Sequence, residues 1–519
     1  MLLAGIAAMA SAFGALLPSA APASAVSGPV VTVAQGRLQG VERRGVDQFL
    51  GIPYAAPPVG PLRWKPPKAA PVWQGTRMAT ELGPPCPQMT DEPPGLTLQE
   101  DCLFLNVHTP AVRTGKPMPV MVWFHGGSYK YGTGGSYDPS RMVAKGVVVV
   151  TVNSRLGALG YLALPSLSAE SADHSSGVYT LMDQQAALRW VRTNAAAFGG
   201  DRGNVTVFGE SAGGANVCQH MVSPTAAGLF HRAVSQSGCG GFTMPNQRQA
   251  DRTGTELATR LGCTDAATAA DCLRTRPVRD IIVEAEPLVW APVVGNTVFP
   301  RQVEEAFAAD AYHHVPVVIG STRDEGAYFV DYDYPEPIPA AEYPEAITRH
   351  FGPEAAARIA TEYPLSDYPS PSRALGAAMT DGIYACSIHQ DTGLLASATP
   401  TYAYEFADPE PAGSDPSIPG AGHTSELPYL FDIDGPPGRP FTRAQRALSD
   451  TMIEYWTRFA RTGNPNGPGT PAWPAFTART PSVLTLTPTH IVPRTDFAAR
   501  HRCAFWLPLH NAGMIDARI

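Results

Sequence analysis

Hydrophobic residues along this chain occur in short unbroken runs, separated by polar loops and by longer stretches with helical spacing. Continuous β-branched or aromatic runs at 120–124, 147–152 and 205–208 are typical of strands that are buried on both faces. Further strands are expected at 233–235, 315–320 and 402–406. Because helical stretches alternate with these strands, the pattern predicts an α/β fold, with a central, mostly parallel β-sheet covered by helices on both faces.

Two long helices are expected from apolar residues that recur on one face. In the first, at 181–198, Leu181 and Leu188 share a face, and the pair of glycines at 199–200 ends the helix. In the second, apolar residues from Leu448 to Phe459 recur with helical spacing, and the aromatic ones among them are best explained as core packing.

Three other regions complete the predicted organisation. The runs at 30–33 and 38–41 flank a four-residue turn and predict a hairpin at the edge of a sheet. The regions 249–307 and 343–394 are expected to be mostly helical insertions, and neither has the Ser/Gly composition of a linker. We therefore expect residues 26–519 to form a single domain.

Composition narrows the class of protein. Of 519 residues, 44% are hydrophobic and 16% are charged, which is typical of a globular chain and not of a disordered one. The net charge is −8, and no block of Lys or Arg is present to attract a nucleic-acid backbone. Nucleic acid is therefore excluded as a partner.

The first 25 residues carry no charged side chain and end in Ala23-Ser24-Ala25, which predicts a secretory signal peptide (1–25) cleaved after Ala25. No Lys or Arg precedes the apolar stretch, so the true start of the signal is open. The alternative, a membrane anchor, is disfavoured because Pro18 and Pro22 interrupt a segment already short for spanning a bilayer. We expect a secreted protein without stable membrane insertion.

Export makes the eight cysteines candidates for disulfides. Local spacing suggests two pairs, Cys86 with Cys102 and Cys263 with Cys272, while eight cysteines allow 105 pairings overall. Neither a C-x-x-C motif nor the Cys/His spacing of a metal site is present. No structural metal is expected.

The strongest chemical signal is Gly209-Glu210-Ser211-Ala212-Gly213, which follows the strand at 205–208 and precedes a helix-compatible run at 215–221. A G-x-S-x-G turn between strand and helix is a nucleophile elbow, in which small neighbours leave the serine exposed. This context predicts that Ser211 is a covalent nucleophile.

A serine nucleophile needs a base and an acid that orients the base. Among the histidines after the strand at 315–320, His423 stands out because it lies in a glycine-rich loop shortly after a strand. The acid is expected at the end of the 315–320 strand, where Asp324 and Glu325 are adjacent. Composition cannot choose between these two carboxylates.

The tetrahedral intermediate of acyl transfer needs backbone donors aimed at its oxyanion. One is expected from Ala212, the residue after the nucleophile, and others from Gly126 and Gly127, which follow the strand at 120–124. His125, which precedes these glycines, is expected to be structural.

At these motifs the chain resembles the type B carboxylesterases, the α/β-hydrolases that include cholinesterases and bacterial para-nitrobenzyl esterases. The resemblance covers essentially the whole mature chain. It rests on seven blocks in family order: 49–60, 100–107, 125–127, 209–214, 324–326, 422–423 and 462–465.

The resemblance implies that Glu325 is the acid and that Gly126, Gly127 and Ala212 form the oxyanion hole. It also implies a buried hydrogen-bonding role behind the triad for Ser237, and Glu210 would add negative potential to a gorge formed by the helical insertions. The same resemblance implies three disulfides and two structural ion pairs: Cys86 with Cys102, Cys263 with Cys272, Cys386 with Cys503, Arg63 with Glu100, and Arg155 with Asp183. Cys218 and Cys239 are left as buried thiols or a fourth bridge.

One departure from the family concerns the substrate. Cholinesterases place a choline-binding tryptophan in the loop closed by the first disulfide, but residues 87–101 contain no aromatic side chain. A cholinesterase is therefore disfavoured, and a wider gorge is expected. Trp290 and Phe242 lie where the family lines its acyl pocket.

Together these features predict a secreted serine esterase that acts through an acyl-enzyme on small-molecule or polymeric esters. It is expected to be a monomer and to need neither a metal nor an organic cofactor. The alternatives are a lipase, polyesterase or amidase with the same triad, and a binding or adhesion protein that has lost catalysis. The last would be expected to lack the serine, the histidine or the acid, and all three are present.

Overall fold

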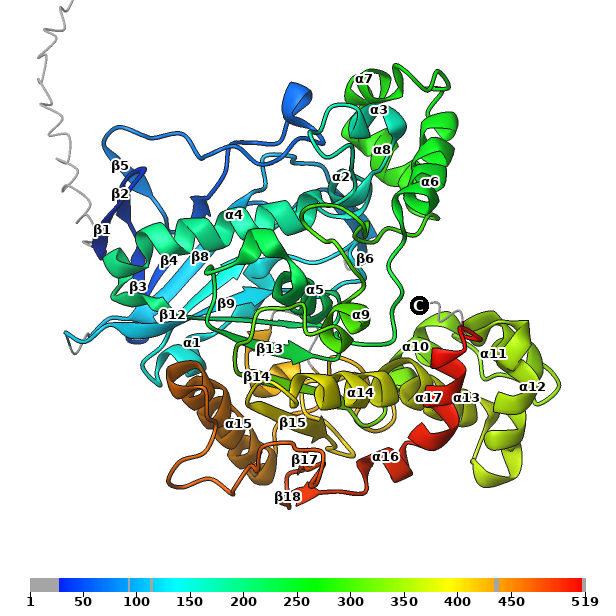
Figure 1. Ribbon diagram of the computed structural model, residues 1–519. Helices are drawn as coiled ribbons and strands as arrows, with labels where there is room; N and C mark the ends of the chain where they lie inside the picture. Colours follow the sequence, from blue (N-terminus) through cyan, green and yellow to red (C-terminus); the bar gives the residue numbers. More distant parts are fainter. Residues whose placement is uncertain (1–27, 92–93, 113–114, 434–437, 516–519) are drawn as a thin grey trace, which may run out of the picture.

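The structure is a computed structural model that describes residues 28–91, 94–112, 115–433 and 438–515. The predicted signal peptide lies outside the described residues. Within them, eleven strands form one mixed sheet in the order β18-β17-β15-β14-β13-β12-β9-β11-β8-β4-β3 (Figure 1). Their bounds are β3 (Val41–Arg43), β4 (Val46–Pro53), β8 (Phe104–Pro110), β9 (Met118–Phe124), β11 (Val148–Val152), β12 (Gly200–Glu210), β13 (Arg232–Gln236), β14 (Val317–Thr322), β15 (Thr401–Phe406), β17 (Val483–Leu486) and β18 (Ile491–Arg494).

The central part of this sheet is parallel. Every neighbouring pair from β11 through β9, β12, β13, β14 and β15 to β17 runs parallel, whereas β3, β4, β8 and β18 pair antiparallel at the two sides. The predicted α/β class with a mostly parallel sheet is confirmed. Parallel strands end at the same edge, so the loops that follow them meet there.

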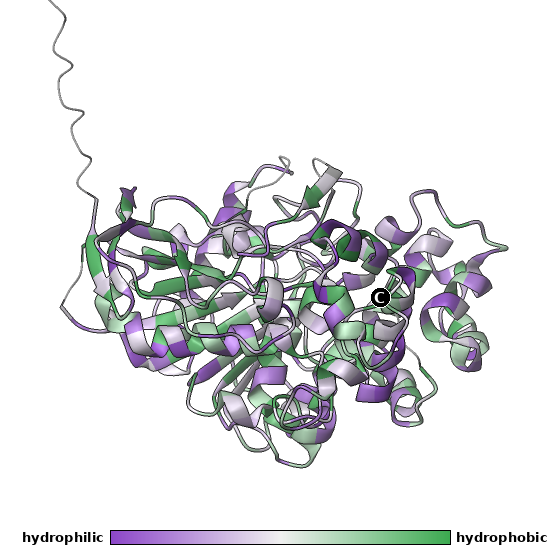
Figure 2. Cartoon of the chain, turned by 90° about the horizontal axis from the view of Figure 1, so that it is seen from above, coloured by the Kyte–Doolittle hydropathy of each residue, from purple (hydrophilic) through white to green (hydrophobic). Residues whose placement is uncertain are grey.

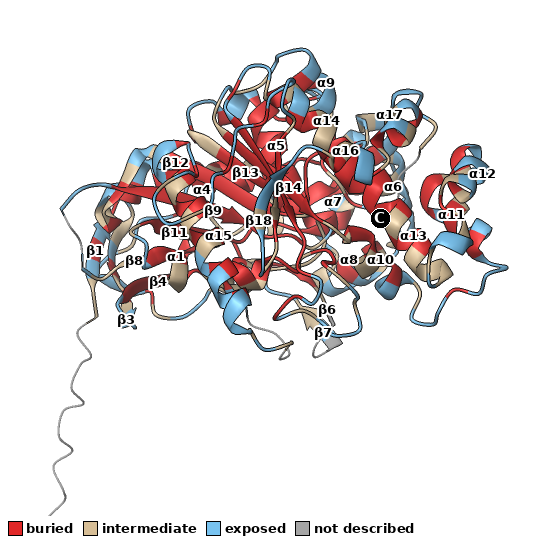
Figure 3. Ribbon diagram, turned by 90° about the horizontal axis from the view of Figure 1, so that it is seen from below, coloured by how far each residue is buried: buried red, intermediate tan, exposed pale blue. Residues whose placement is uncertain are grey.

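Both faces of the sheet are covered, which explains the unbroken apolar runs. In β9, Val120 and Val122 enter one hydrophobic core together with α4 (Tyr179–Asn194) and α5 (Ala212–Val222). Met121 and Trp123 enter a second core with α15 (Arg443–Thr462) on the opposite face. Successive side chains of a strand alternate between faces, so every position in such a strand must be apolar. Figures 2 and 3 show the result, with apolar, buried strands between helices that are polar on their outer sides.

The two predicted long helices are present, with ends that follow from local chemistry. In α15 the N-terminal Thr442 and Gln445 form a reciprocal capping box, and Gly463 ends the helix with a φ of 79°. Helix α4 continues into a short 3-10 turn, η3 (Ala195–Phe198), before it ends at Gly199.

Helices fill both predicted insertions. The first holds α6 (Gln247–Arg260), α7 (Ala269–Arg274), α8 (Val278–Ala285) and α9 (Val303–Ala308). The second holds α11 (Tyr343–Phe351), α12 (Pro353–Glu362), α13 (Pro371–Met379), a π-helical turn η6 (Thr380–Ala385) and α14 (Cys386–Leu395). Helices α6 to α8 and α11 to α13 both lie toward the right of Figure 1, away from the N-terminal strands. Among the described residues, no helix combines the length and the apolar character needed to cross a bilayer.

The N-terminal hairpin differs in one respect from the prediction. β1 (Val30–Val33) and β2 (Gly36–Gln39) pair antiparallel, but together with β5 (Thr76–Met78) they form a separate small sheet instead of extending the main one. Val31, Val33 and Leu38 pack against the main core from outside, while Val30 is exposed. The hairpin therefore packs one apolar face against the core and does not form an edge strand of the main sheet.

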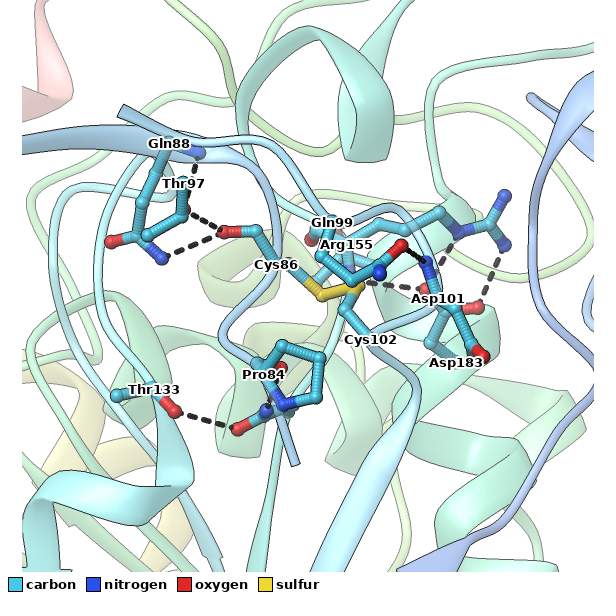
Figure 4. The surroundings of a disulfide bond; sticks show 12 residues. Pro84, Cys86, Gln88, Thr97, Gln99, Asp101, Cys102, Thr133, Arg155 and Asp183 are labelled. Atoms are coloured by element: carbon cyan, nitrogen blue, oxygen red, sulfur yellow. Dashed lines mark hydrogen bonds and ion pairs between the residues drawn. A yellow bond between two sulfur atoms is a disulfide. The ribbon is translucent and has the colours of Figure 1, made fainter. Parts of the chain in front are cut away.

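The described cysteines form four disulfides. Three pairs are those expected above: Cys86 with Cys102, Cys263 with Cys272, and Cys386 with Cys503. The fourth joins Cys218 of α5 to Cys239, the pair that the sequence left open. Around the first disulfide, Figure 4 shows Arg155 held by both carboxylate oxygens of Asp183, each at 2.7 Å. Arg63 forms the other expected ion pair, with Glu100.

Candidate active site

Ser211 lies in a sharp turn between β12 and α5. Its φ of 55° and ψ of −126° are strained for a residue with a side chain, and its N–H donates to Gln236 O at 2.9 Å. Its carbonyl accepts from Ala215 N, in the first turn of the helix. This is the predicted strand-turn-helix geometry of a nucleophile elbow.

The glycines beside Ser211 are required by close backbone contacts. A Cβ on Gly213 would lie 2.0 Å from Phe124 O, and a Cβ on Gly209 would lie 2.5 Å from the backbone of Gly213. No side chain fits at either position. The elbow is therefore held by β9 on one side and by its own helix on the other.

His423 and Glu325 meet from loops that are far apart in the sequence. Glu325 begins α10 (Glu325–Asp333) at the end of β14, and His423 lies in the glycine-rich loop after β15. The Nδ1 atom of His423 lies 2.5 Å from Glu325 Oε2, and both side chains are buried. A carboxylate at this position fixes the orientation and the tautomer of an imidazole.

Glu325 itself is held by two other donors. Ser237, at the end of β13, donates its hydroxyl to Glu325 Oε1 at 2.5 Å, and Thr322 N donates to the same atom at 2.7 Å. The neighbouring Asp324 instead accepts from Ala421 N, two residues before His423. The structure therefore brings Glu325 to the imidazole and uses Asp324 to hold the backbone of the histidine loop.

The other ring nitrogen of His423 faces the nucleophile segment. Its Nε2 atom lies 3.3 Å from Glu210 Oε1, next to Ser211 in the chain, and makes no hydrogen bond within the described residues. Ser211 and His423 are thus not hydrogen-bonded to each other here, a contact that often forms only when substrate binds. When His423 is neutral with its proton on Nδ1, Nε2 is left available to accept a proton.

Burial and neighbouring charges shift the pKa values of His423 and Glu210. Burial lowers the pKa of His423, but the carboxylates of Glu210 and Glu325 outweigh burial and raise it to about 9. Burial in turn raises the pKa of Glu210 to about 8, against the opposing effect of the imidazole. The site therefore favours a positive charge on His423.

Aromatic rings that were not predicted from the sequence surround the imidazole. The ring centroid of His423 lies 4.9 Å from that of Phe329, 5.3 Å from Tyr384 and 5.8 Å from Tyr328. Phe329 follows Glu325 by four residues in α10, so helical spacing could have indicated it. Tyr384 belongs to the distant η6 turn, and no local signal in the sequence points to it.

A second buried carboxyl, Glu426, lies behind the triad. Its Oε1 accepts from Gln236 Nε2 at 3.0 Å, and Gln236 Oε1 accepts from the indole of Trp456 at 3.1 Å. Burial and the nearby Glu325 raise the pKa of Glu426 to about 7. The sequence contains only an ordinary-looking Glu three residues after His423, so this residue was also missed.

The loop after β9 packs directly against the elbow. A Cβ on Gly126 would lie 3.0 Å from Ser211 Cβ. Within the described residues, the backbone N–H groups of Gly126, Gly127 and Ala212 have no protein acceptor. His125 Nδ1 lies 2.8 Å from Gly126 O, which agrees with a structural role. Free backbone N–H groups near the nucleophile are what an oxyanion hole requires, and Gly126 and Ala212 lie next to Ser211.

A cavity of about 800 Å³ reaches His423 from the histidine loop. Its lining includes the aromatic side chains of Tyr137, Tyr328 and Phe431 together with Asp415 and Asp432. Of the two residues expected near an acyl pocket, Phe242 lies edge-on to Tyr384, and Trp290 packs in the core formed by helices α7 and α8. In the described part of the chain, no group of three His, Cys, Asp or Glu side chains is arranged to hold a metal ion.

Comparison with known proteins gives a consistent assignment. The model of the carboxylesterase family matches residues 27–506. The chain is 34% identical to an acylcarnitine hydrolase of Mus musculus over 86% of both chains, and 35% identical to a para-nitrobenzyl esterase of Bacillus subtilis (strain 168) over 88% of this chain and 94% of the other. A solved structure of a PNB esterase superposes with a TM-score of 0.78 at 33% identity, covering 92% of this chain and 99% of that one.

These matches extend over nearly the whole described chain. The parallel sheet with its covering helices is accordingly the α/β-hydrolase fold. The chain belongs to the carboxylesterase family and is a carboxylic-ester hydrolase.

Proposed function

We propose that this protein is an exported serine esterase that cleaves carboxylic esters through a covalent acyl-enzyme, with Ser211, His423 and Glu325 as its triad. The observation that carries the proposal is the buried contact between His423 Nδ1 and Glu325 Oε2, which leaves Nε2 facing the segment of Ser211. The strained turn of Ser211 and the free N–H groups of Gly126, Gly127 and Ala212 support it.

In the first half-reaction, Ser211 Oγ attacks the ester carbonyl carbon while His423 Nε2 takes its proton. The N–H groups of Gly126, Gly127 and Ala212 stabilise the negative oxygen of the tetrahedral intermediate. The intermediate then breaks its bond to the alcohol oxygen, which receives the proton from His423. Water repeats these steps on the acyl-enzyme, releasing the carboxylic acid and restoring the Ser211 hydroxyl.

A broad ester range is part of the proposal. Similar proteins are named for different esters: an acylcarnitine hydrolase, a cocaine esterase and a para-nitrobenzyl esterase. The segment 87–101 contains no aromatic residue that would select a quaternary ammonium. Export is supported by the predicted signal peptide and by the four disulfides of the described chain.

We expect the purified mature protein to hydrolyse short-chain and medium-chain aryl esters and to turn over the matching anilides far more slowly. The measurement is initial rate across an acyl-chain series of para-nitrophenyl esters, with long-chain esters, polyester film and anilides assayed in parallel. A maximum with long chains or with film would instead assign a lipase or a polyesterase. Turnover of anilides alone would contradict the ester-hydrolase proposal.

Replacement of Glu210 by Gln is expected to shift the pH dependence of catalysis toward acid. His423 must be neutral to take the proton of Ser211, and its pKa of about 9 is raised in part by Glu210, so kcat/KM of the wild type should increase as pH approaches 9. Without that carboxylate, the acidic limb should move down by about 1 to 2 pH units. An unchanged acidic limb in a pH profile from 6 to 10 would contradict the effect of Glu210 on the pKa of His423.

A further inference from the structure

The π-helical turn η6 (Thr380–Ala385) joins the proposed active site to a buried ionic network. All six of its residues are buried, and it separates two ordinary α-helices, α13 and α14. A π-helical turn is rare and often lies at a functional site, because it redirects side chains that a regular helix would place elsewhere. Some of its side chains contact the proposed active site, and others contact the ionic network on its other side.

Toward the active site, η6 contacts both the histidine and the segment of the acid. The ring of Tyr384 lies 5.3 Å from the ring of His423 and stacks on Phe329 at 5.8 Å. Thr380 Oγ1 accepts a hydrogen bond of 2.9 Å from Gly326 N, directly after Glu325. A shift of this turn would therefore displace the neighbours of the imidazole and of the carboxylate together.

Away from the active site, Asp381 of the same turn reaches His501. Asp381 Oδ1 lies 2.6 Å from His501 Nδ1, and the other ring nitrogen, Nε2, lies 2.8 Å from Glu405 Oε1 in β15. A neutral imidazole has one N–H and can donate to one of these carboxylates only. When both carboxylates are ionised, His501 can donate to both only as an imidazolium, which then bridges η6 to the central sheet.

The groups around His501 favour that charge. Arg500 donates to both oxygens of Glu405, at 3.1 and 2.9 Å, and Tyr363 donates to Asp381 Oδ2 at 2.7 Å. Other titratable groups near this network are His389 in α14, whose pKa is lowered by burial and by His501, and Tyr368, whose pKa is raised by burial and by Asp381. The other charged groups are Arg502, which lies over the ring of Tyr363, and Asp496, which pairs with both Arg500 and Arg494. Burial lowers the pKa of His501, but Asp381 and Glu405 outweigh it and raise the pKa to about 9.

Helix α17 holds η6 from the same side as this network. A Cβ on Gly382 would lie 2.5 Å from the ring of Trp506, and His510 Nε2 lies 2.6 Å from Gly382 O. The Cys386–Cys503 disulfide ties the residue after η6 to the start of α17 (Cys503–Asn511). The turn is thus fixed from one side by α17 and by the ion pair of Asp381 with His501.

We infer that His501 is a positioning residue for catalysis: bridging Asp381 and Glu405, it fixes η6, which in turn holds Tyr384 against His423 and Thr380 against the segment of Glu325. The inference rests on the proposed function, since it assigns His501 a role only through the triad. Because the folded pKa lies above the value of about 6.5 for an unfolded histidine, this bridge stabilises the fold fully below pH 6.5 and is lost as pH rises through about 9.

The test compares His501→Gln and Asp381→Asn with Arg500→Gln as the matched control. Each of the first two should lower kcat by about 10-fold to 100-fold, as expected when a catalytic group is misplaced, with KM changed far less. Their double variant should lose no more kcat than His501→Gln alone, because the two residues act through one contact. Arg500→Gln also weakens the network at Glu405 but contacts no residue of η6, so it should lower Tm and leave kcat unchanged.

Several outcomes would overturn the inference. Wild-type kcat in both His501→Gln and Asp381→Asn would do so, as would an equal loss of kcat in Arg500→Gln at a similar loss of Tm. If His501→Gln does not fold, the milder Asp381→Asn decides, because it keeps the size of the side chain and removes the negative charge that pairs with His501. The proposed function is tested separately by Ser211→Ala in the otherwise native chain. Activity that survives this change would contradict the proposed triad, whatever the results with the His501 variants.

Discussion

Ser211→Ala is expected to lower kcat for ester hydrolysis by about 10⁵-fold to 10⁶-fold while leaving thermal unfolding nearly unchanged. The alanine keeps the backbone of the elbow, including the hydrogen bonds from Ser211 N to Gln236 O and from Ala215 N to Ser211 O. What disappears is the only atom that can form the acyl-enzyme. Residual activity would come from the oxyanion N–H groups and from substrate binding alone.

The measurement combines steady-state kinetics with labelling by an aryl fluorophosphonate and mass spectrometry of the labelled peptide. Ser235→Ala is the matched control, because Ser235 is buried one strand away and bonds Gly214 O behind the elbow. It should lose some stability but retain labelling and turnover. Labelling that persists in Ser211→Ala would assign the nucleophile to another residue.

The sheet could be predicted well because its chemistry is local. A strand covered on both faces must be apolar at every position, and the runs at 120–124 and 147–152 correspond to β9 and β11. The predicted ends of the strands were less accurate. β12 begins at Gly200, where the residues are polar and partly exposed, and β14 begins at Val317 because Pro316 interrupts the predicted run.

The site could be predicted only as far as each residue is marked by its own segment. Ser211 and His423 lie in glycine-rich turns after strands, which is a local signal. The choice between Asp324 and Glu325 depends on where α10 begins, because adjacent residues at a helix start point in different directions. The composition of the segment does not contain that information, and the resemblance to a family was needed to make the choice.

Contacts between distant segments could not be predicted from the sequence. Tyr384 meets His423 because a π-helical turn brings it there, and Cys218 pairs with Cys239 because the helix after the nucleophile lies against the turn after β13. Eight cysteines permit too many pairings for spacing to decide. The separate N-terminal sheet was likewise missed, since an edge strand and a packed hairpin have the same alternating pattern.

Glu325→Gln is expected to lower kcat by about 10⁴-fold, with KM little changed. The carboxylate accepts from Ser237, from Thr322 N and from His423 Nδ1. A glutamine has one acceptor oxygen and brings an NH₂ group toward donors that already fill the site, so the imidazole turns or takes the wrong tautomer. It also removes the negative charge that stabilises the imidazolium formed when Ser211 attacks.

The adjacent Asp324→Asn is the matched control for this prediction, because it removes a carboxylate one residue away. Its side-chain oxygen can still accept from Ala421 N and hold the histidine loop, so turnover should stay close to that of the wild type. Single-turnover kinetics on a para-nitrophenyl ester, with Tm measured for each variant, separate a slower acylation step from a loss of folded enzyme. An active Glu325→Gln beside an inactive Asp324→Asn would move the acid to Asp324, and comparable losses in both would mean that the whole β14–α10 turn, and not one carboxylate, supports the histidine.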